Sequence, residues 1–292
     1  ESDWSSDVCS SDLQRRIERL FGNLEWQAHP LWLLNFGSTL EHNSLGSTTF
    51  SPRVNANYRL LPEQTLRFGV SRSYRTPSLY EMRGDLRYAA LPPVNINGLT
   101  LSDRQYFGNP LLKPEEVTTY EIGYLGDFKH LRSSLDVRIF QENIPNLIRT
   151  VSQPLSPGNC DTIDYPDCGK ADSSFNAQHV KIEGIEYQWH WQPFDETRLI
   201  FSQAHLRIKT GLNDYPIGTT DINDQNKLLT QAIHSAPSRS SSLMLMQKLP
   251  YGIDASVMYY TVDAIKWSLN TSNTAYKRLD YRLAYPFQWG QK

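Results

Sequence analysis

The chain has 292 residues, with 29 basic and 31 acidic side chains and a formal net charge of −2. This balance excludes the class of proteins that bind nucleic acid through a strongly basic surface. Aromatic residues make up 12% of the chain, including 16 Tyr and 7 Trp, although the mean hydropathy is −0.52. Because Tyr and Trp are favoured at membrane–water interfaces, the composition points to a membrane protein.

The first 13 residues need a separate interpretation. They read ESDWSSDVCSSDL and resemble translated read-through of a sequencing adapter, the alternative being a genuine Ser/Asp-rich loop. We therefore set residues 1–13 aside as an artefact or disordered segment and assign residues 14–292 to one domain. On this interpretation Trp4 and Cys9 carry no meaning, and the natural protein extends upstream.

Alternating apolar and polar residues recur along the rest of the chain, which is the signal of β-strands. Residues 53–60 alternate between Arg or Asn and Val, Ala, Tyr or Leu, and the pattern returns at 66–71, 131–139 and 279–289. About eleven such strands are expected. No run approaches the roughly 20 apolar residues of a membrane-spanning helix. A membrane protein built from strands has to form a closed barrel, because lipid cannot satisfy an open backbone.

The connections between the expected strands alternate between short and long. The short ones lie at 29–30, 61–63, 126–130, 193–197 and 249–252, and the long ones near 42–50, 75–115, 152–174, 210–235 and 266–274. Bacterial outer-membrane barrels have this asymmetry, with short periplasmic turns and long external loops. The pattern predicts an all-β fold, namely an antiparallel up-and-down transmembrane β-barrel that is incomplete in this chain.

In such a barrel the apolar side chains face lipid and the polar ones line the lumen. The expected lumen residues include Arg53, Arg59, Arg67, Glu121, Asp136 and Arg138, which would pair with one another or with a domain inside the barrel. The alternation changes phase at Gly184, since Val180 and Ile182 precede it and Ile185 and Tyr187 follow it. An isolated Gly at a phase change predicts a β-bulge.

Four stretches of the sequence carry a resemblance. Residues 67–81 read RFGVSRSYRTPSLYE, and residues 108–115 read GNPLLKPE and run into TYEIGY at 119–124. The other two are IEGIE at 182–186 and DYRLAYPF at 280–287. In this order they resemble the β-barrel of TonB-dependent outer-membrane receptors. Pro77 cannot donate a ladder hydrogen bond, so it ends the pairing at the top of its strand. We interpret the four motifs as scaffold that shapes the barrel and touches no ligand, because a motif shared by a family cannot encode which ligand is carried.

The resemblance covers residues 14–292 and implies about eleven strands of a barrel with about 22 in a Gram-negative outer membrane. It also implies that the plug domain and the closing strand are missing from this chain. Its two unpaired edges predict that the chain does not fold stably alone. The implied partners are the TonB complex through the missing plug, outer-membrane lipid, and a scarce ligand, most often a ferric siderophore.

Other readings stay open at the level of the sequence. Within the family the cargo could be cobalamin, haem or a glycan. A passive porin-like channel is the alternative among membrane proteins, and a secreted soluble all-β binding protein or lectin is the alternative outside them. No nucleophile elbow, phosphate-binding Gly loop or dinucleotide fingerprint is present, so the sequence predicts no enzyme and no cofactor.

Candidate ligand contacts lie in the long loop at 75–115. This loop combines arginines with aromatic residues, which suit an anionic, aromatic ferric siderophore through charge and cation–π contacts. The candidates are Arg83, Arg87, Tyr88, Arg104, Tyr106 and Phe107. The alternative is a solvated loop that packs its rings on itself.

Two cysteines, Cys160 and Cys168, fall in another predicted external loop. At the cell surface they are expected to form a disulfide that closes a small loop. Free thiols are the alternative, and a metal site is not expected, because the pair lacks neighbouring His at zinc spacing. The seven His residues are scattered and form no ligand pair.

Overall fold

The computed structural model describes residues 15–44, 47–89, 95–96, 99–100, 102–154, 170–214, 222–268, 270–287 and 290. Most of them form one sheet of thirteen strands, in which a path of eleven runs in chain order. The strands of that path are β1 (Ile17–His29), β2 (Trp32–Asn43), β3 (Ser47–Leu61), β4 (Gln64–Arg75), β9 (Glu115–Phe128), β10 (Ser133–Pro154), β11 (Lys170–Phe194), β12 (Thr197–Leu212), β13 (Arg239–Leu249), β14 (Ile253–Val262) and β17 (Tyr276–Ala284). Each pairs antiparallel with the next, so the predicted incomplete up-and-down barrel of about eleven strands is confirmed.

The remaining elements lie in the long connections. Between β4 and β9 these are helix α1 (Leu79–Arg83), a hairpin of β5 (Asp85–Ala89) with β8 (Ser102–Phe107), and the small pair β6 (Asn95–Ile96) and β7 (Leu99–Thr100). Helix α2 (Ile222–Ile233) lies between β12 and β13, and the pair β15 (Ile265–Lys266) and β16 (Ser272–Asn273) lies between β14 and β17. The 3₁₀ turns η1 (Lys129–Leu131) and η2 (Pro250–Gly252) occupy short connections.

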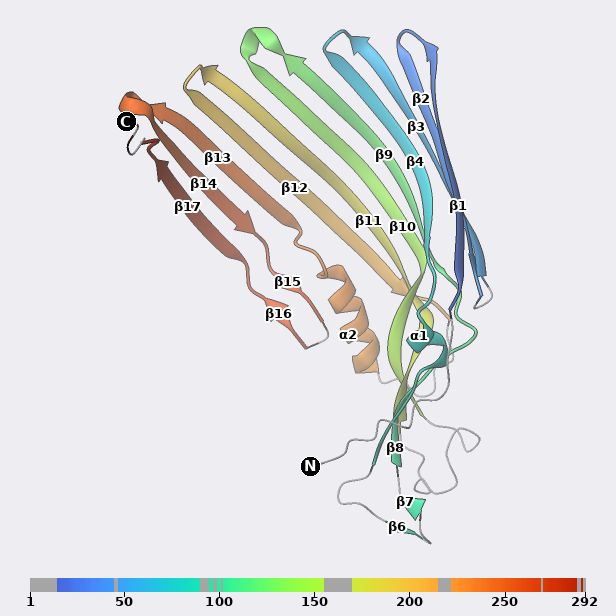
Figure 1. Cartoon of the computed structure of the whole chain (residues 1–292). Coiled ribbons are helices and arrows are strands. Elements are labelled where there is room, and N and C mark those ends of the chain that lie inside the picture. Colours follow the sequence, from blue (N-terminus) through green and yellow to red (C-terminus); the bar gives the residue numbers. More distant parts are fainter. Residues whose placement is uncertain are drawn as a thin grey trace.

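Figure 1 shows the two ends of the sheet. The tight turns that join β1 to β2, β3 to β4, β9 to β10, β11 to β12 and β13 to β14 share one end, and α1, α2 and β8 lie at the other. We call the end with the long connections the external rim. Four of the five predicted long connections are found at this end, but the one expected near 42–50 is wrong, because β2 ends at Asn43 and β3 begins at Ser47. The turn expected at 126–130 is shifted because β9 continues to Phe128.

The apolar side chains of one face form a belt that crosses the sheet diagonally. One row of paired residues starts with Leu24, Phe36, Val54, Val70 and Tyr120 and ends with Gln141, Glu183 and Arg207. A row nearer the short turns is apolar in the later strands and contains Leu135, Trp189, Phe201, Leu243, Tyr259 and Leu279. Such a shift is expected when tilted, staggered strands cross a level layer of lipid. We call this the outward face.

The predicted bulge at Gly184 is wrong. β11 pairs without a register shift from Lys181 to Trp191 with both β10 and β12. The phase of the sequence changes because β11 is 25 residues long, whereas about 9–11 tilted residues cross a bilayer. Gly184 has a different role, since a Cβ there would lie 2.5 Å from Cζ of Phe140, whose ring fills the space.

The buried core sits at the external rim and not in the barrel wall. One cluster joins Val151, Ala177 and Leu228, and a second joins Met82, Leu112 and Ile148. In β10 and β11 the buried hydrophobic side chains are Phe140 in mid-strand and, toward the rim ends, Ile148, Val151, Ala171, Ala177 and Val180, whereas 55% of Ile139 and 43% of Leu243 are exposed. In the part of the chain that the structure describes, neither helix is long and apolar enough to cross a membrane.

Helix α2 was not anticipated, because its residues fell in a predicted loop at 210–235. Its sequence, INDQNKLLTQAI, places Leu228 and Ala232 four residues apart, and both are buried at 5% and 2% exposure. Residues at this spacing share one face of a helix. The buried side of α2 therefore covers the rim above Val151 and Ala177.

Candidate functional site at the external rim

Helix α1 begins where β4 leaves the sheet. Pro77 lacks an N–H and is fully buried, and Ser78 then caps the helix. The Ser78 hydroxyl accepts a hydrogen bond from the Glu81 N–H at 3.1 Å, and the Glu81 carboxylate accepts one from the Ser78 N–H at 2.7 Å. This capping box satisfies two backbone donors at the start of a five-residue helix that would be marginal alone.

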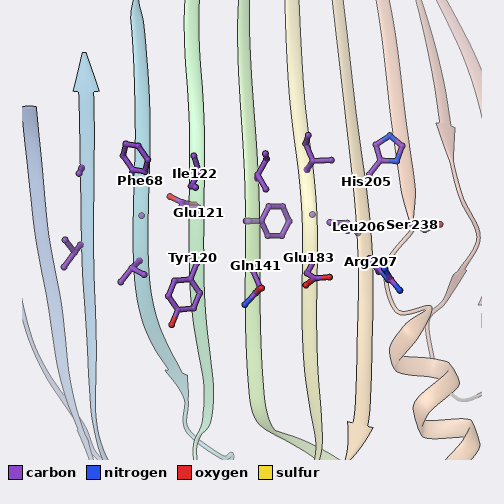
Figure 2. Close-up of a pocket in the computed structure, with 18 residues that line it drawn as sticks. Phe68, Tyr120, Glu121, Ile122, Gln141, Glu183, His205, Leu206, Arg207 and Ser238 are labelled. Atoms are coloured by element: carbon purple, nitrogen blue, oxygen red, sulfur yellow. The ribbon is translucent and has the colours of Figure 1, made fainter. Parts of the chain in front are cut away.

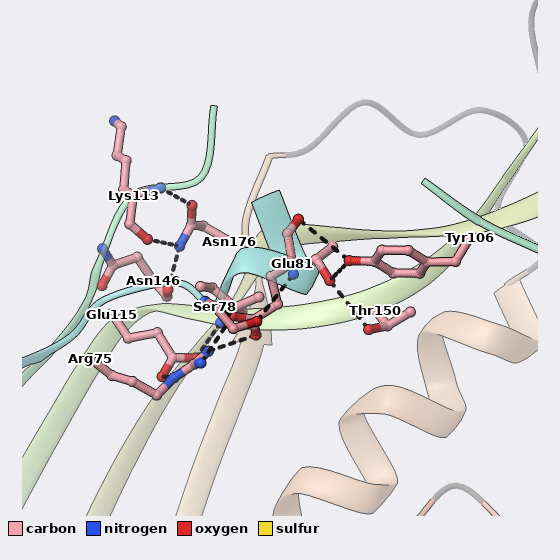
Figure 3. Close-up of polar contacts among 11 residues, drawn as sticks. Arg75, Ser78, Glu81, Tyr106, Lys113, Glu115, Asn146, Thr150 and Asn176 are labelled. Atoms are coloured by element: carbon pink, nitrogen blue, oxygen red, sulfur yellow. Dashed lines mark hydrogen bonds and ion pairs between the residues drawn. The ribbon is translucent and has the colours of Figure 1, made fainter. Parts of the chain in front are cut away.

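Arg75, the last residue of β4, holds the two sides of the loop together. Its guanidinium donates to both carboxylate oxygens of Glu81, at 3.0 and 3.1 Å, and to Glu115 at the start of β9 (Figure 3). The other oxygen of Glu115 accepts the N–H of Ile148 at 2.7 Å. The hydrogen bond to Glu115 raises the pKa of Arg75 above its ordinary value, despite partial burial.

The motif at 108–115 packs directly against this corner. The N–H of Asn109 donates to the carbonyl of Glu81 at 2.9 Å, and the N–H of Gly108 donates to that of Gly84 at 2.6 Å. A Cβ at Gly108 would lie 2.4 Å from the backbone nitrogen of Arg83, so only glycine fits. We call residues 75–84 and 106–116, with these contacts, the rim clamp.

Two asparagines fasten the rim clamp to the long strands. The Asn176 side chain accepts from the N–H of Lys113 at 2.9 Å and donates to the Lys113 carbonyl at 3.0 Å (Figure 3). Asn146 donates to the carbonyl of Pro114 at 2.7 Å and accepts the N–H of Glu116 at 3.1 Å. The two family-like motifs therefore form one interlocked unit, as their interpretation as scaffold requires.

Tyr106, one of the six candidate ligand contacts, belongs to this unit. Only 4% of its surface is exposed, and its ring stacks on Tyr80 with centroids 4.2 Å apart. Its hydroxyl lies 2.9 Å from the Ser174 hydroxyl, and burial raises its pKa above the ordinary value. A side chain so enclosed presents almost no surface to a ligand, so Tyr106 acts as a packing residue.

Two of the candidate arginines meet at one acid, Asp85, of the β5–β8 hairpin. Arg87 and Arg104 each form a salt bridge with Asp85 at 3.0 Å, and the Arg104 guanidinium lies 5.4 Å from the ring centre of Phe107. Burial acts to raise the pKa of Asp85, but the hydrogen bond from Arg87 and the charge of Arg104 outweigh it, so this pKa lies below its usual range. Asp85 thus stays ionised at neutral pH.

The other two candidates flank this group. Arg83 is exposed at the end of α1, and among the described residues it has no ion pair. The backbone of Tyr88 pairs with Asp103 in the hairpin. The hairpin therefore brings Arg87 and Arg104 together at Asp85 on the external rim, whereas the sequence shows only that these residues share one loop.

The lumen face carries a second polar group. Arg138 donates to Glu121 at 3.0 Å and to Glu186 at 3.5 Å, and its guanidinium lies 4.5 Å from the ring centre of Phe140. Arg67 of β4 pairs with Asp136 of β10 across the intervening strand β9. Four of the predicted lumen residues thus pair with one another across the wall, namely Arg138 with Glu121 and Arg67 with Asp136, which keeps charges away from the lipid face.

A pocket of about 1080 Å³ lies along the barrel wall and not at the rim clamp. It is a groove on the outward face across β3, β4 and β9 to β12. Figure 2 shows Phe68 and Ile122 in it, with Gln141, Glu183 and Arg207 nearer to the end that carries α2. Because lipid contacts this face, we do not assign the groove as the binding site of a soluble cargo, despite its size.

The predicted disulfide between Cys160 and Cys168 lies outside the described residues and stays a prediction. Across the residues that the structure describes, no group of three or more His, Cys, Asp or Glu side chains could hold a metal ion.

These features define an outer-membrane receptor barrel, and the chain belongs to the TonB-dependent receptor family. The family model described as "TonB dependent receptor-like, beta-barrel" matches residues 4–291, so the match begins inside the segment that the sequence analysis sets aside. The sequence-based prediction of this family and of an outer-membrane location is confirmed.

Particular relatives are similar over parts of their length. The ferric enterobactin receptor of Pseudomonas aeruginosa is 25% identical over 178 residues, which are 61% of this chain and 23% of that protein. The iron-regulated outer membrane virulence protein of Vibrio cholerae is 32% identical over 101 residues, 35% of this chain and 14% of that protein. The chain therefore spans less than a quarter of these curated relatives.

Solved structures share the fold at lower identity. A mutant ferric enterobactin receptor of P. aeruginosa in complex with enterobactin superposes with a TM-score of 0.69 at 17% identity, covering 94% of this chain and 38% of that one. The siderophore receptor PirA of the same species gives a TM-score of 0.66 at 14% identity, covering 94% and 43%.

Proposed function

We propose that the whole protein binds a ferric siderophore outside the cell and imports it across the outer membrane with energy from TonB. The observation that carries this proposal is the family of the barrel, since this family is made of receptors and transporters and not of enzymes. The names of its relatives, a ferric enterobactin receptor and an iron-regulated outer-membrane protein, favour iron as the cargo. In the whole protein, the plug that contacts TonB would lie inside the barrel, against the lumen face of these strands.

The β5–β8 hairpin is the proposed ligand-contacting part of this segment. Arg87 and Arg104 both pair with Asp85, and Arg83 is exposed at the end of α1. An anionic siderophore can accept charge-assisted hydrogen bonds from guanidinium groups. Phe107, already beside Arg104, can stack on an aromatic ligand.

Uptake of radiolabelled iron tests the proposed function. A strain that depends on the full-length receptor should take up a ferric siderophore and should lose this uptake when its tonB gene is deleted. Uptake that persists without TonB would indicate the passive porin-like channel instead. Uptake of cobalamin, haem or a glycan, with no iron transport, would keep the energised mechanism and replace the cargo.

Substitutions in the hairpin test the proposed contacts. Arg83→Ala and Arg104→Ala should each weaken siderophore binding by roughly tenfold, because a hydrogen bond to a charged group contributes about 1.5–3 kcal/mol. Lys248→Ala is the matched control, because Lys248 lies at the short-turn end of β13, away from the external rim. This variant should bind the siderophore normally. If all three variants bind the siderophore with equal affinity, the hairpin is not part of the binding site, and the conclusion from the uptake experiment still stands.

A further inference from the structure

A separate cleft of about 420 Å³ lies on the lumen face of β1 to β4, the strands at one side of the sheet (Figure 1). Its lining carries hydroxyl and amide groups and a guanidinium and, among the described residues, no carboxylate. The polar side chains on its lumen side are Asn23, Thr39, Ser51, Arg53, Ser71 and Ser73. Neutral hydrogen-bond donors around a positive charge suit an anion.

Arg53 supplies the positive charge of this cleft. A Cβ at Gly37 would lie 3.5 Å from both Nε and Nη2 of Arg53, so the guanidinium lies along the wall, over the backbone of that glycine. The Arg53 side chain is exposed, and among the described residues it has no ion pair. A second arginine that lines the cleft, Arg72, belongs to the outward face and pairs with Glu116 at 3.2 Å. The charge of Arg53 is therefore open to a ligand.

Three other arginines of the lumen face are already neutralised by carboxylates. These ion pairs are Arg19 with Glu41, Arg67 with Asp136, and Arg138 with Glu121. An anion inside the barrel is attracted more strongly to an uncompensated charge than to a neutralised pair. Because Arg53 lies near the middle of β3 (Ser47–Leu61), an anion held there has left the external rim and is within the barrel.

We propose that this cleft is a transit subsite, in which Arg53 holds an anionic oxygen of the cargo during its passage through the lumen. The inference rests on the proposed function and adds the side of the barrel that the cargo follows, along β1 to β4. The hydroxyl groups of Ser51, Ser71 and Ser73 donate further hydrogen bonds. Because these donors are neutral, they bind the anion less strongly than additional cations would, and the cargo can leave again.

Uptake kinetics of the full-length receptor test the subsite, with a radiolabelled ferric siderophore and cells that carry equal amounts of each variant. Arg53→Gln should lower the maximal uptake rate about tenfold, because the focused positive charge is lost. It should leave the affinity of the cell surface for the siderophore unchanged. Arg53→Lys keeps the charge and should retain most of the rate. Arg59→Gln is the matched control, because it removes a cation from the same strand and face outside the cleft.

Equal maximal rates in R53Q and the unaltered receptor, with TonB-dependent uptake in both, would overturn the subsite and leave the proposed function intact. Equal losses in R53Q and R59Q, or a weaker surface affinity in R53Q, would also overturn it. The permeability of the cells to vancomycin shows whether the plug is seated. A rise in R53Q alone would assign Arg53 to a plug contact and contradict the transit subsite. Absence of iron uptake by the unaltered receptor would contradict the proposed function and the subsite together.

Discussion

The barrel wall and the external rim follow opposite rules for burial. In the wall, large apolar side chains such as Ile139 and Leu243 remain exposed on one face, and Arg138 and Glu121 pair on the other. At the rim, Met82, Leu112 and Ile148 are less than 9% exposed and form a core like that of a soluble protein. The wall uses lipid as its apolar solvent, whereas the rim stands in water and has to bury its own apolar groups.

The same difference governs polar groups. Wall charges need only reach a partner across the lumen face, so pairs such as Arg138 with Glu186 stay partly exposed. At the rim Glu115 is only 7% exposed and both of its oxygens are used, by Arg75 and by the N–H of Ile148. Substitutions should therefore act through lipid contact in the wall and through packing or hydrogen bonding at the rim.

The largest effect is expected for a charge placed on the outward face of the wall. Leu243→Arg should destabilise the folded receptor by about 2–4 kcal/mol if the site lies near the bilayer midplane. The neighbouring substitution Ser242→Arg, one residue away on the lumen face, should have much less effect. Denaturant unfolding in lipid vesicles measures both, and similar losses at the two positions would contradict the assignment of the faces.

A smaller effect is expected for overpacking at the rim. Gly108→Ala would place a Cβ 2.4 Å from the backbone nitrogen of Arg83, so the rim clamp has to open at a cost of about 1–3 kcal/mol. Gly22→Ala on the wall, where no atom lies within 4 Å, is the control. Hydrogen exchange should rise in residues 79–112 of the first variant and stay low in the second. Unchanged exchange in both would show that the clamp is not tight.

The smallest effect is a pH response of the rim clamp. Burial acts to raise the pKa of Glu81, but hydrogen bonds from Arg75 and Ser78 outweigh it, so the pKa lies below the ordinary 4.5. A lowered carboxyl pKa contributes stability that is present above 4.5 and is lost as the pH falls through the folded value. Hydrogen exchange at α1 should therefore increase at acid pH, modestly because solvent screens the pair. Glu81→Gln should abolish this acid-induced increase in hydrogen exchange. If the increase is unchanged in this variant, another group causes it.

Much of the wall could be predicted from the sequence. The alternation in residues 53–60 and 279–284 is local, because successive side chains of a strand point to opposite faces whatever its neighbours are. The alternation of short and long connections likewise fixed which ends of the strands share a side. Neither signal specifies the pairing register between neighbouring strands. The phase change at Gly184 was therefore wrongly interpreted as a bulge.

The site depended more on tertiary structure. The arginines and aromatic rings of the loop at 75–115 could be found in the sequence, but nothing local separates the enclosed Tyr106 from the exposed Arg83. That difference arises because Tyr106 meets Tyr80 and Ser174, which are distant in the chain.

The sequence by itself determined the strand period, the sidedness of the connections and the family of the barrel, since these follow from nearest neighbours and from contiguous motifs. Only the tertiary structure decided that residues 75–81 and 108–115 lock together, that α2 covers the rim, and that Lys181 faces Lys209. The physical reason is that strand stagger and long-range packing set which residues meet, and both are properties of the whole sheet.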